Sequence, residues 1–452
     1  MRNGLQDPRH RLRLAKMIAK IEASPGLSFP QLFEPSELEA CYRFLNNVQV
    51  NPQAILAPHF AEVARLSAEE GEVLVLHDTT DFSFGGDSPR EGLGRLRAKN
   101  NAFFAHVSLV VSMSGYRRPL GVAALHTWAR NDETIDEHAR WFGNVLLSRA
   151  HIPAGQAVHV MDREGDDYCL FWKLVEGGER FVIRSTHNRL LESPQFAKLK
   201  EATSNLTREV QRTAQLSARS DEGKQKRQRD RHPARGSRTA ELAIAATTVN
   251  LKRPKVHPRD KAKSRPGNLP PSLRVNVVRV WEPAPPEGED PVEWHLLTTE
   301  DISSAEALER VVDIYRTRWT IEEYFKALKT GCSMEKRQLE DYESLCNALA
   351  VFVPIACRAL ALRSAAREPQ GTSHASPVFT QEEVDVLSAL KPKLVPQHPT
   401  TRDVLLAVAA LGGHIKWNGD PGWQTLMRGM HKFLTVMIGV GLAKLQYVRD
   451  QS

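Results

Sequence analysis

Two short apolar runs, each followed closely by an aspartate, constrain the fold of this chain most. The run at residues 72–76 leads into His77 and Asp78, and the run at residues 157–161 leads into Asp162. A continuous apolar run of this length is typical of a strand that is buried on both faces of a sheet. Such strands need helices on both sides, so the pattern predicts an α/β fold. If the two strands are neighbours, their aspartates lie side by side.

The segments around these runs predict the remainder of a mixed sheet. We expect further strands at residues 104–112, 119–126 and 180–185, a helix at residues 132–149 and another that ends near residue 174. Elements in this order describe a mixed sheet with helices packed on it. A single aspartate after a strand is weak evidence for a site, because aspartate commonly begins turns. A third acid further along the chain strengthens the prediction that the two aspartates belong to a functional site.

Residues 315–329 predict an amphipathic helix with a mixed polar stripe. At roughly 100° per residue, the stripe contains Tyr315, Arg318, Glu322, Lys326 and Lys329. A carboxylate among cations suits a site that holds a metal ion and a phosphate together, since the acid binds the cation and the bases bind the anion. The ordinary alternative is a solvated face steadied by weak ion pairs. The two aspartates upstream favour the first interpretation.

Basic segments outside this helix each have two possible roles. Residues 7–22 predict a basic amphipathic helix, with Asp7 as its N-cap, Pro8 at its first position, and Arg9 and Arg13 on its surface. These arginines either contact phosphates or form a solvated face. A polar insertion at residues 188–285 contains the basic runs 224–231 and 261–265, which are either disordered or a phosphate clamp. Further helices are expected near residues 36–46, 342–367, 381–390, 401–410 and 422–445, with a linker at residues 368–379.

Charge and composition point to a nucleic-acid partner. The chain of 452 residues carries a formal net charge of +7, which favours a polyanion. Its five cysteines are scattered and form no C-x-x-C pair, so neither a disulfide framework nor a structural zinc site is expected. The sequence shows no apolar run that approaches the length of a membrane span, and no signal peptide. We therefore expect a cytoplasmic protein with no membrane partner.

Three acids, Asp78, Asp162 and Glu322, form the candidate catalytic and metal-binding set. Phosphodiester transfer by the two-metal route needs carboxylates that hold two divalent cations about 3.5–4 Å apart. Oxygen ligands favour Mg²⁺ or Mn²⁺. His77 precedes the first acid, but neighbouring residues of a strand point to opposite faces. We therefore expect His77 to be a packed histidine and not a metal ligand.

The order and spacing of these residues resemble the signature of DDE transposases of the insertion sequence four family. The resemblance rests on Tyr315-x2-Arg318-x3-Glu322-x6-Lys329, together with Asp78-Thr-Thr and Asp162-Arg-Glu, and it extends over nearly the whole chain. It implies a ribonuclease H-like mixed-sheet catalytic core with a β-rich insertion, flanked by N-terminal and C-terminal helical domains. The implied boundaries are 1–52 for the domain that binds the DNA end, 53–187 and 286–367 for the two parts of the core, 188–285 for the basic insertion, and 368–452 for a dimerisation domain. Because the resemblance begins inside the family's first helical region, we expect the end-binding domain to be shortened at its start.

The resemblance also implies a role for individual residues. Asp78, Asp162 and Glu322 would hold two Mg²⁺ ions, for which Mn²⁺ can substitute. Trp294 would stack on a base flipped out of the duplex, a contact worth roughly 1–3 kcal/mol; the alternative is a buried strand tryptophan. The full set of implied DNA contacts is Tyr315, Arg318, Lys326, Lys329, Trp294, Trp319, Arg184, Arg9 and Arg13.

The implied activity is cut-and-paste DNA transposition in the bacterial cytoplasm, in association with the nucleoid. Water nicks one strand at the end of the element, the freed 3′-hydroxyl forms a hairpin with the opposite strand, a second water reopens it, and the 3′-hydroxyl joins target DNA. The implied partners are double-stranded DNA, as element ends and as target, and a second copy of the chain in a homodimer. Two other functions remain open: a non-catalytic, DNA-binding and dimerising repressor, and a general nuclease on the same core.

Overall fold

The computed structural model describes residues 4–86, 88–96, 99–113, 117–129, 137–218, 234–255, 269–365, 379–415 and 420–450. The predicted basic runs at residues 224–231 and 261–265 lie outside these described residues, as does all but the last residue of the predicted linker at residues 368–379.

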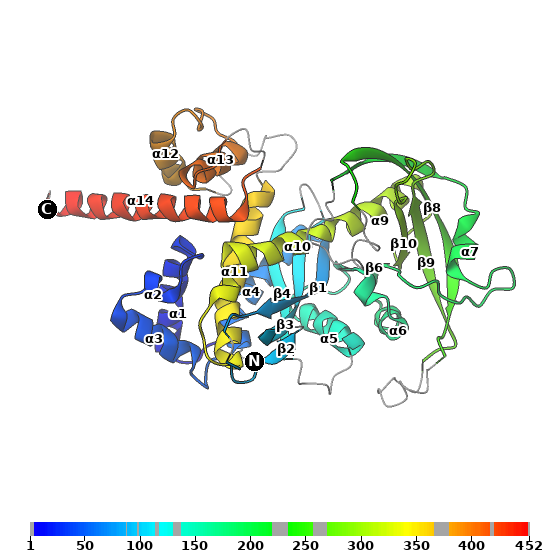
Figure 1. Cartoon of the computed structure of the whole chain (residues 1–452), viewed down its shortest axis with the longest axis horizontal. Coiled ribbons are helices and arrows are strands. Elements are labelled where there is room, and N and C mark those ends of the chain that lie inside the picture. The colour runs from blue at the N-terminus through cyan, green and yellow to red at the C-terminus, as the bar shows by residue number, and fades with distance from the viewer. Residues whose placement is uncertain are drawn as a thin grey trace.

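The described strands form one mixed sheet (Figure 1). They are β1 (Val73–Ser83), β2 (Gly94–Leu96), β3 (Lys99–Ser112), β4 (Pro119–Trp128), β5 (Ala157–Met161), β6 (Arg180–Arg184), β7 (Val210–Leu216), β8 (Arg238–Lys252), β9 (Ser272–Trp281) and β10 (Glu293–Thr298). Their order in the sheet is β2-β3-β1-β5-β6-β10-β9-β8-β7, with β4 paired to β3. The strands predicted from the apolar runs are therefore present, and the strands of residues 188–285 continue the same sheet.

The central part of the sheet has the ribonuclease H-like arrangement. Strand β1 pairs antiparallel with β3, which pairs antiparallel with β4, whereas β5 and β6 follow on the other side of β1 in parallel. Parallel neighbours need a crossover connection, and a helix between the strands supplies it. The mixed α/β fold with this core confirms the fold class predicted from the sequence.

Helices cover both faces of the sheet and form groups at one end of the molecule (Figure 1). They are α1 (Pro8–Ala23), α2 (Phe29–Leu32), α3 (Pro35–Leu45), α4 (Pro52–Glu70), α5 (Glu137–Arg149), α6 (Tyr168–Glu176), α7 (Leu199–Ser204), α9 (Ala305–Thr317), α10 (Trp319–Lys326), α11 (Tyr342–Ala365), α12 (Gln381–Leu390), α13 (Thr401–Leu411) and α14 (Trp423–Asp450). Shorter turns are the 3-10 segments η1 (Arg163–Gly165) and η4 (Met334–Lys336) and the π-helical segment η3 (Ala327–Gly331). Asp7 caps α1 by accepting a hydrogen bond from the amide of Arg9, as its sequence predicts.

Strand β1 is longer than the apolar run predicts. Its antiparallel pairing with β3 continues to Ser83, whereas its parallel pairing with β5 ends where His77 lies opposite Met161. The prediction that Asp78 ends its strand is therefore wrong. Asp78 lies within β1, at the point where β5 stops, because β3 still supplies backbone partners there.

Helix α11 corrects a second expectation from the sequence. Its length and composition are those of a helix that could cross a membrane, contrary to the expectation that no apolar run has this length. In this structure 78% of its most apolar window is buried. The helix packs against α4 and β4, so most of its apolar surface contacts other parts of the chain.

The predicted helix over residues 315–329 is divided into three pieces. Helix α9 ends at Thr317, α10 begins at Trp319, and the π-helical segment η3 follows α10 directly. Segments of π-helix occur frequently at functional sites. The polar stripe is therefore not the face of a single straight helix, although its residues remain on consecutive turns.

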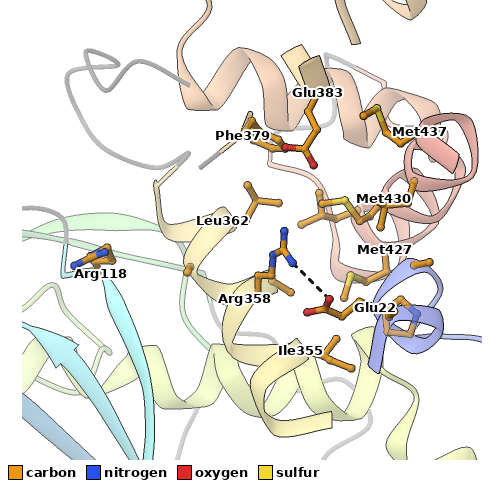
Figure 2. Close-up of a pocket in the computed structure, with 17 residues that line it drawn as sticks. Glu22, Arg118, Ile355, Arg358, Leu362, Phe379, Glu383, Met427, Met430 and Met437 are labelled. Atoms are coloured by element: carbon orange, nitrogen blue, oxygen red, sulfur yellow. Dashed lines mark hydrogen bonds and ion pairs between the residues drawn. The ribbon is translucent and has the colours of Figure 1, made fainter. Parts of the chain in front are cut away.

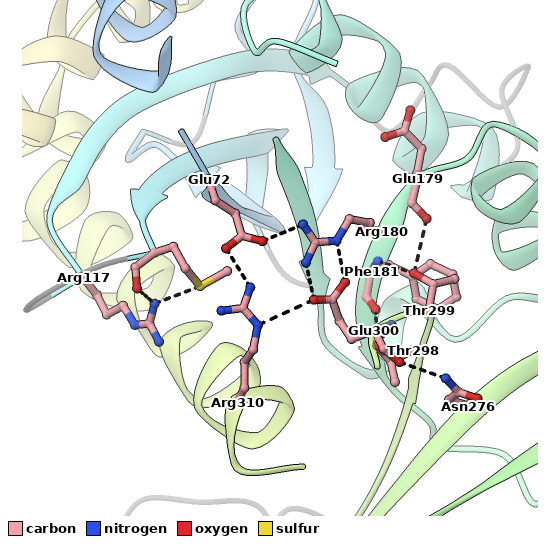
Figure 3. A network of polar contacts seen from close by, with 11 residues as sticks. Glu72, Arg117, Glu179, Arg180, Phe181, Asn276, Thr298, Thr299, Glu300 and Arg310 are labelled. Carbon is pink, nitrogen blue, oxygen red and sulfur yellow. Dashed lines mark hydrogen bonds and ion pairs between the residues drawn. The ribbon is translucent and has the colours of Figure 1, made fainter. Parts of the chain in front are cut away.

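A network of charges ties α9 to the sheet (Figure 3). The carboxylate of Glu72, just before β1, accepts hydrogen bonds from Arg310 of α9 at 2.7 Å and from Arg180 of β6 at 2.5 Å. Arg180 also pairs with Glu300 at 2.5 Å. These bonds fix where α9 lies on the sheet, and so determine where Arg318, which follows α9, meets β1.

The N-terminal and C-terminal helices meet at an apolar cavity of about 720 Å³ (Figure 2). Its lining comes from α1, α11, α14 and the start of α12, and includes Met427 and Met430. At its edge, Arg358 Nη1 lies 3.5 Å from Glu22 Oε2. Helices α13 and α14 cross beside it with their backbones in close approach. Gly412 and Gly429 allow this approach, since a Cβ atom on either one would collide with a carbonyl oxygen of the other helix.

Candidate active site

The first two acids lie next to each other on parallel strands. Asp78 and Asp162 directly follow His77 and Met161, the last residues that pair β1 with β5. One carboxylate oxygen of each lies within 4.8 Å of the other, and an oxygen of Glu164 lies within the same distance of both. Three hard oxygen donors this close together fit a divalent cation such as Mg²⁺ or Mn²⁺.

The third predicted acid reaches this cluster through an arginine. Arg318 Nη1 lies 3.3 Å from Asp78 Oδ2 and 3.6 Å from Glu322 Oε1. Its guanidinium is largely buried, with 13% of the side chain exposed. The structure thus brings Asp78, Asp162 and Glu322 into one site, with the guanidinium between Asp78 and Glu322.

Burial and mutual repulsion perturb the central carboxylate. Asp78 is buried, and this burial, together with repulsion from the charges of Asp162 and Glu322, raises its pKa to about 7, although the guanidinium of Arg318 opposes the shift. A proton on Asp78 relieves the repulsion, and a divalent cation at the same place relieves it more strongly. A divalent cation would therefore stabilise this group of carboxylates.

His77 points away from the acids, as the alternation of the strand predicts. It is fully buried; its Nε2 lies 2.8 Å from His159 Nδ1, and its Nδ1 lies 3.0 Å from Ser108 Oγ. Burial lowers the pKa of His77 well below its ordinary value. The histidine is thus a packed residue that joins β1 to β5 and β3 on the face opposite Asp78.

An aromatic and basic group lies beside the acids. The rings of Trp294 and Tyr315 meet edge to face, with centroids 5.5 Å apart, and the guanidinium of Arg184 lies 5.9 Å from the Trp294 ring. Trp294 is partly exposed and also packs on the core. Burial lowers the pKa of Arg184, so its charge is incompletely solvated and an anion near it would be stabilised.

The remaining residues of the predicted stripe lie along α10 and η3. Trp319 is 57% exposed, and Lys326 lies 5.6 Å from the centroid of its ring and 2.8 Å from Glu323. Lys329 lies 5.4 Å from the centroid of Phe82, which is on β1. These side chains place an exposed ring and two cations along α10 and η3, the segments that follow Arg318.

The two predicted arginines of the N-terminal helix are not part of this group. Arg9 is exposed and pairs with Asp7 at 2.8 Å, and Arg13 is half-buried on the same helix. Helix α1 belongs to the helical group at one end of the molecule, away from β6 (Figure 1). Any DNA contact made by α1 is therefore separate from the acidic cluster.

Glu164 is the residue of the cluster to which the sequence assigned no role. It belongs to the Asp162-Arg-Glu motif. Because β5 ends at Met161, the strand alternation no longer predicts where the side chains of Arg163 and Glu164 point. The one feature of the sequence that could have identified Glu164 as a candidate ligand was its position two residues after Asp162, a predicted metal ligand.

Two protein-family models match parts of the chain. One, described as transposase DNA-binding, matches residues 3–50, and the other, described as transposase DDE domain, matches residues 191–351. The second match contains Trp294, Arg318 and Glu322, whereas Asp78 and Asp162 precede it. Among solved structures, a cryo-EM structure of the piggyBac transposase synaptic complex with hairpin DNA is similar, with 9% sequence identity and a TM-score of 0.37 over 80% of this chain and 67% of that chain.

Proposed function

From the premise that this chain carries a transposase DNA-binding domain and a transposase DDE domain, we propose that it is a Mg²⁺-dependent, cut-and-paste DNA transposase. We assign it to the insertion sequence four family, with its closest resemblance to the transposase of bacterial transposon five. The proposal rests mainly on one observation: Asp78 and Asp162 are neighbours on parallel strands, and Arg318 connects Asp78 to Glu322.

The proposed chemistry divides the work between carboxylates and cations. Asp78, Asp162 and Glu322 would hold two divalent ions, which would supply activation of the attacking hydroxyl and stabilisation of the leaving oxygen. Arg318 already lies among the carboxylates, so it is placed to bind the phosphate that is attacked there. Mn²⁺ can replace Mg²⁺ because both accept oxygen ligands in similar geometry.

The residues around the acids would hold the DNA ends. Trp294, whose ring contacts Tyr315 and Arg184, would stack on a flipped base, and this contact would stabilise a hairpin by roughly 1–3 kcal/mol. Lys326, Lys329 and Trp319 would contact the adjacent DNA backbone. Arg9 and Arg13 of α1 would contact the element end at a second position.

The proposed reaction passes through a hairpin and ends in strand transfer into target DNA. Its partners are the inverted repeats at the element ends, the target duplex and a second copy of the chain, paired through residues 368–452. We place the protein in the bacterial cytoplasm, on the nucleoid. The domain boundaries given from the sequence remain part of this proposal.

The test is a cleavage assay with Mg²⁺ and a duplex that carries the terminal inverted repeat of the element. We expect a nick at the element end followed by a hairpin, and no product from Asp78→Asn protein. Shifted but uncut duplex would instead identify a repressor. Cleavage that ignores the end sequence would identify a general nuclease.

A further inference from the structure

Among the described residues, Glu164 and not Glu322 completes the group of close carboxylates around Asp78 and Asp162. One oxygen each from Asp78, Asp162 and Glu164 lies within 4.8 Å of the others. Glu322, by contrast, lies next to Arg318, whose guanidinium also contacts Asp78. In the described structure, a cation could therefore bind the carboxylates of Asp78, Asp162 and Glu164. The guanidinium of Arg318 lies between Asp78 and the fourth carboxylate, that of Glu322.

The turn that carries Glu164 is fixed at its first residue. Turn η1 begins directly after β5, and the amide of Glu164 donates to Asp162 Oδ1 at 2.7 Å. The amide of Gly165 donates to the carbonyl of Asp162 at 3.2 Å. These bonds curl the chain back, so the side chain of Glu164 returns to the carboxylate of Asp162. One oxygen of Asp162 is used by the turn, and the other remains for a ligand.

The end of the turn is fixed as well. The carboxylate of Asp166 accepts hydrogen bonds from the amide of Thr186 at 2.6 Å, the amide of His187 at 2.9 Å and the hydroxyl of Ser185 at 3.0 Å. These three donors follow β6, the strand next to β5. Because the sheet holds both ends of the turn, the backbone at Glu164 is fixed next to Asp162, while its side chain is exposed at the surface of the site.

Gly165 allows the turn to be this tight. A Cβ atom at this position would lie 2.8 Å from the Cβ atom of Met161 and 3.1 Å from its sulfur. The Cβ of Met161 belongs to β5 and cannot move without the strand. A larger residue at position 165 would push the turn outward, and Glu164 with it, without removing any carboxylate.

We propose that Glu164 is a ligand of the divalent cation in the DNA-free protein, together with Asp78 and Asp162, and that Glu322 is not needed for this first binding step. The inference rests on the proposed function, since it concerns the same metal site. Three carboxylate oxygens suit Mg²⁺ or Mn²⁺, which commonly complete their coordination with water. Glu322 becomes available to a cation only when a phosphate competes for Arg318.

The experiment is a calorimetric titration of the full chain with Mn²⁺ in the absence of DNA. Glu164→Gln should weaken Mn²⁺ binding by about tenfold or more, since even groups that merely support metal ligands change affinity by about 10–100-fold. Glu322→Gln should leave the affinity nearly unchanged. Glu176→Gln, at an exposed glutamate at the end of α6, is the matched control and should bind as the wild type does.

A second variant moves Glu164 without removing its charge. Gly165→Ala should also weaken Mn²⁺ binding, while its circular dichroism spectrum remains that of the wild type. The inference is wrong if Glu164→Gln binds Mn²⁺ as the wild type does, or if Glu322→Gln loses as much affinity as Glu164→Gln.

Cleavage of the inverted-repeat duplex by the same proteins separates this inference from the proposed function. A wild-type enzyme that cuts this duplex, with Glu164→Gln protein that still binds Mn²⁺ normally, would overturn the inference alone. Loss of Mn²⁺ binding in Glu164→Gln, with wild-type protein that never cuts, would support the ligand and overturn the proposed function.

Discussion

Replacing Asp78 by asparagine should stabilise the metal-free protein at alkaline pH while it abolishes cleavage. Only 8% of the residue is exposed, and burial, with the charge of Asp162, raises the pKa of its carboxyl from 3.8 to about 7. This difference corresponds to roughly 4 kcal/mol, at about 1.36 kcal/mol per unit. Asparagine has nearly the same size and cannot ionise, so it removes this cost and also removes a metal ligand.

The folded chain binds this proton more tightly than the unfolded chain does. Below the unfolded pKa of 3.8, Asp78 is protonated in both states and has no electrostatic cost. Between this value and about 7, the unfolded chain has released the proton and the folded chain has kept it. The contribution of Asp78 to stability therefore falls as the pH rises through this window, and it stays at its lowest value above the window.

The assay is urea denaturation in EDTA, followed by tryptophan fluorescence between about pH 4 and about pH 8.5. The free energy of unfolding of Asp78→Asn, relative to the wild type, should rise by about 2–4 kcal/mol across this range. Asp81→Asn is the matched control, because Asp81 lies on the same strand and an odd number of residues away, on its other face. It should follow the wild type.

Excess Mg²⁺ provides an independent check at alkaline pH. It should stabilise the wild type, because a ligand that binds only the folded state adds its binding free energy to stability. It should leave Asp78→Asn nearly unchanged. If the free energy of unfolding depends on pH identically in the wild type and in Asp78→Asn, the assignment of a raised pKa to Asp78 is refuted.

Three further predictions address the other parts of the molecule. Glu322→Ala should reduce cleavage by more than about 100-fold and leave DNA binding in a gel-shift assay intact; equal loss of both would argue against its metal role. Trp294→Ala should reduce hairpin yield by roughly tenfold after a normal first nick, whereas an unchanged yield would remove Trp294 from the site. Gly429→Ala should destabilise the C-terminal helices by about 2–3 kcal/mol in thermal unfolding, because its new methyl group would collide with the backbone of α13. Gly439→Ala in the same helix has open space and should be neutral or slightly stabilising.

Much of the fold could be predicted because local patterns encode it. The apolar runs before Asp78 and Asp162 identify strands that are buried on both faces, and Asp7 and Ser304 mark helix starts by accepting hydrogen bonds from backbone amides nearby. Local periodicity also placed Arg318 and Glu322 on one stripe. These features depend on residues only a few positions apart, so the sequence alone contains them.

Other features depend on partners that are distant in the chain. The continuation of β1 past Asp78 is decided by β3, and the burial of α11 is decided by α4 and β4. The pairing of Glu72 with Arg310 joins residues 238 positions apart. No local pattern specifies such contacts, because they form only when the sheet and its helices have assembled.

The sequence by itself identified Asp78, Asp162 and Glu322 as acids that could bind a metal, and the tertiary structure decided how they are arranged and which other acid lies with them. Strand order made Asp78 and Asp162 neighbours, and the docking of α9 put Arg318 between Asp78 and Glu322. A glycine-dependent turn, held by Asp166, brought Glu164 into the cluster. Residue type fixes the chemistry of a side chain, but its distance from another carboxylate depends on backbone contacts made by the whole fold.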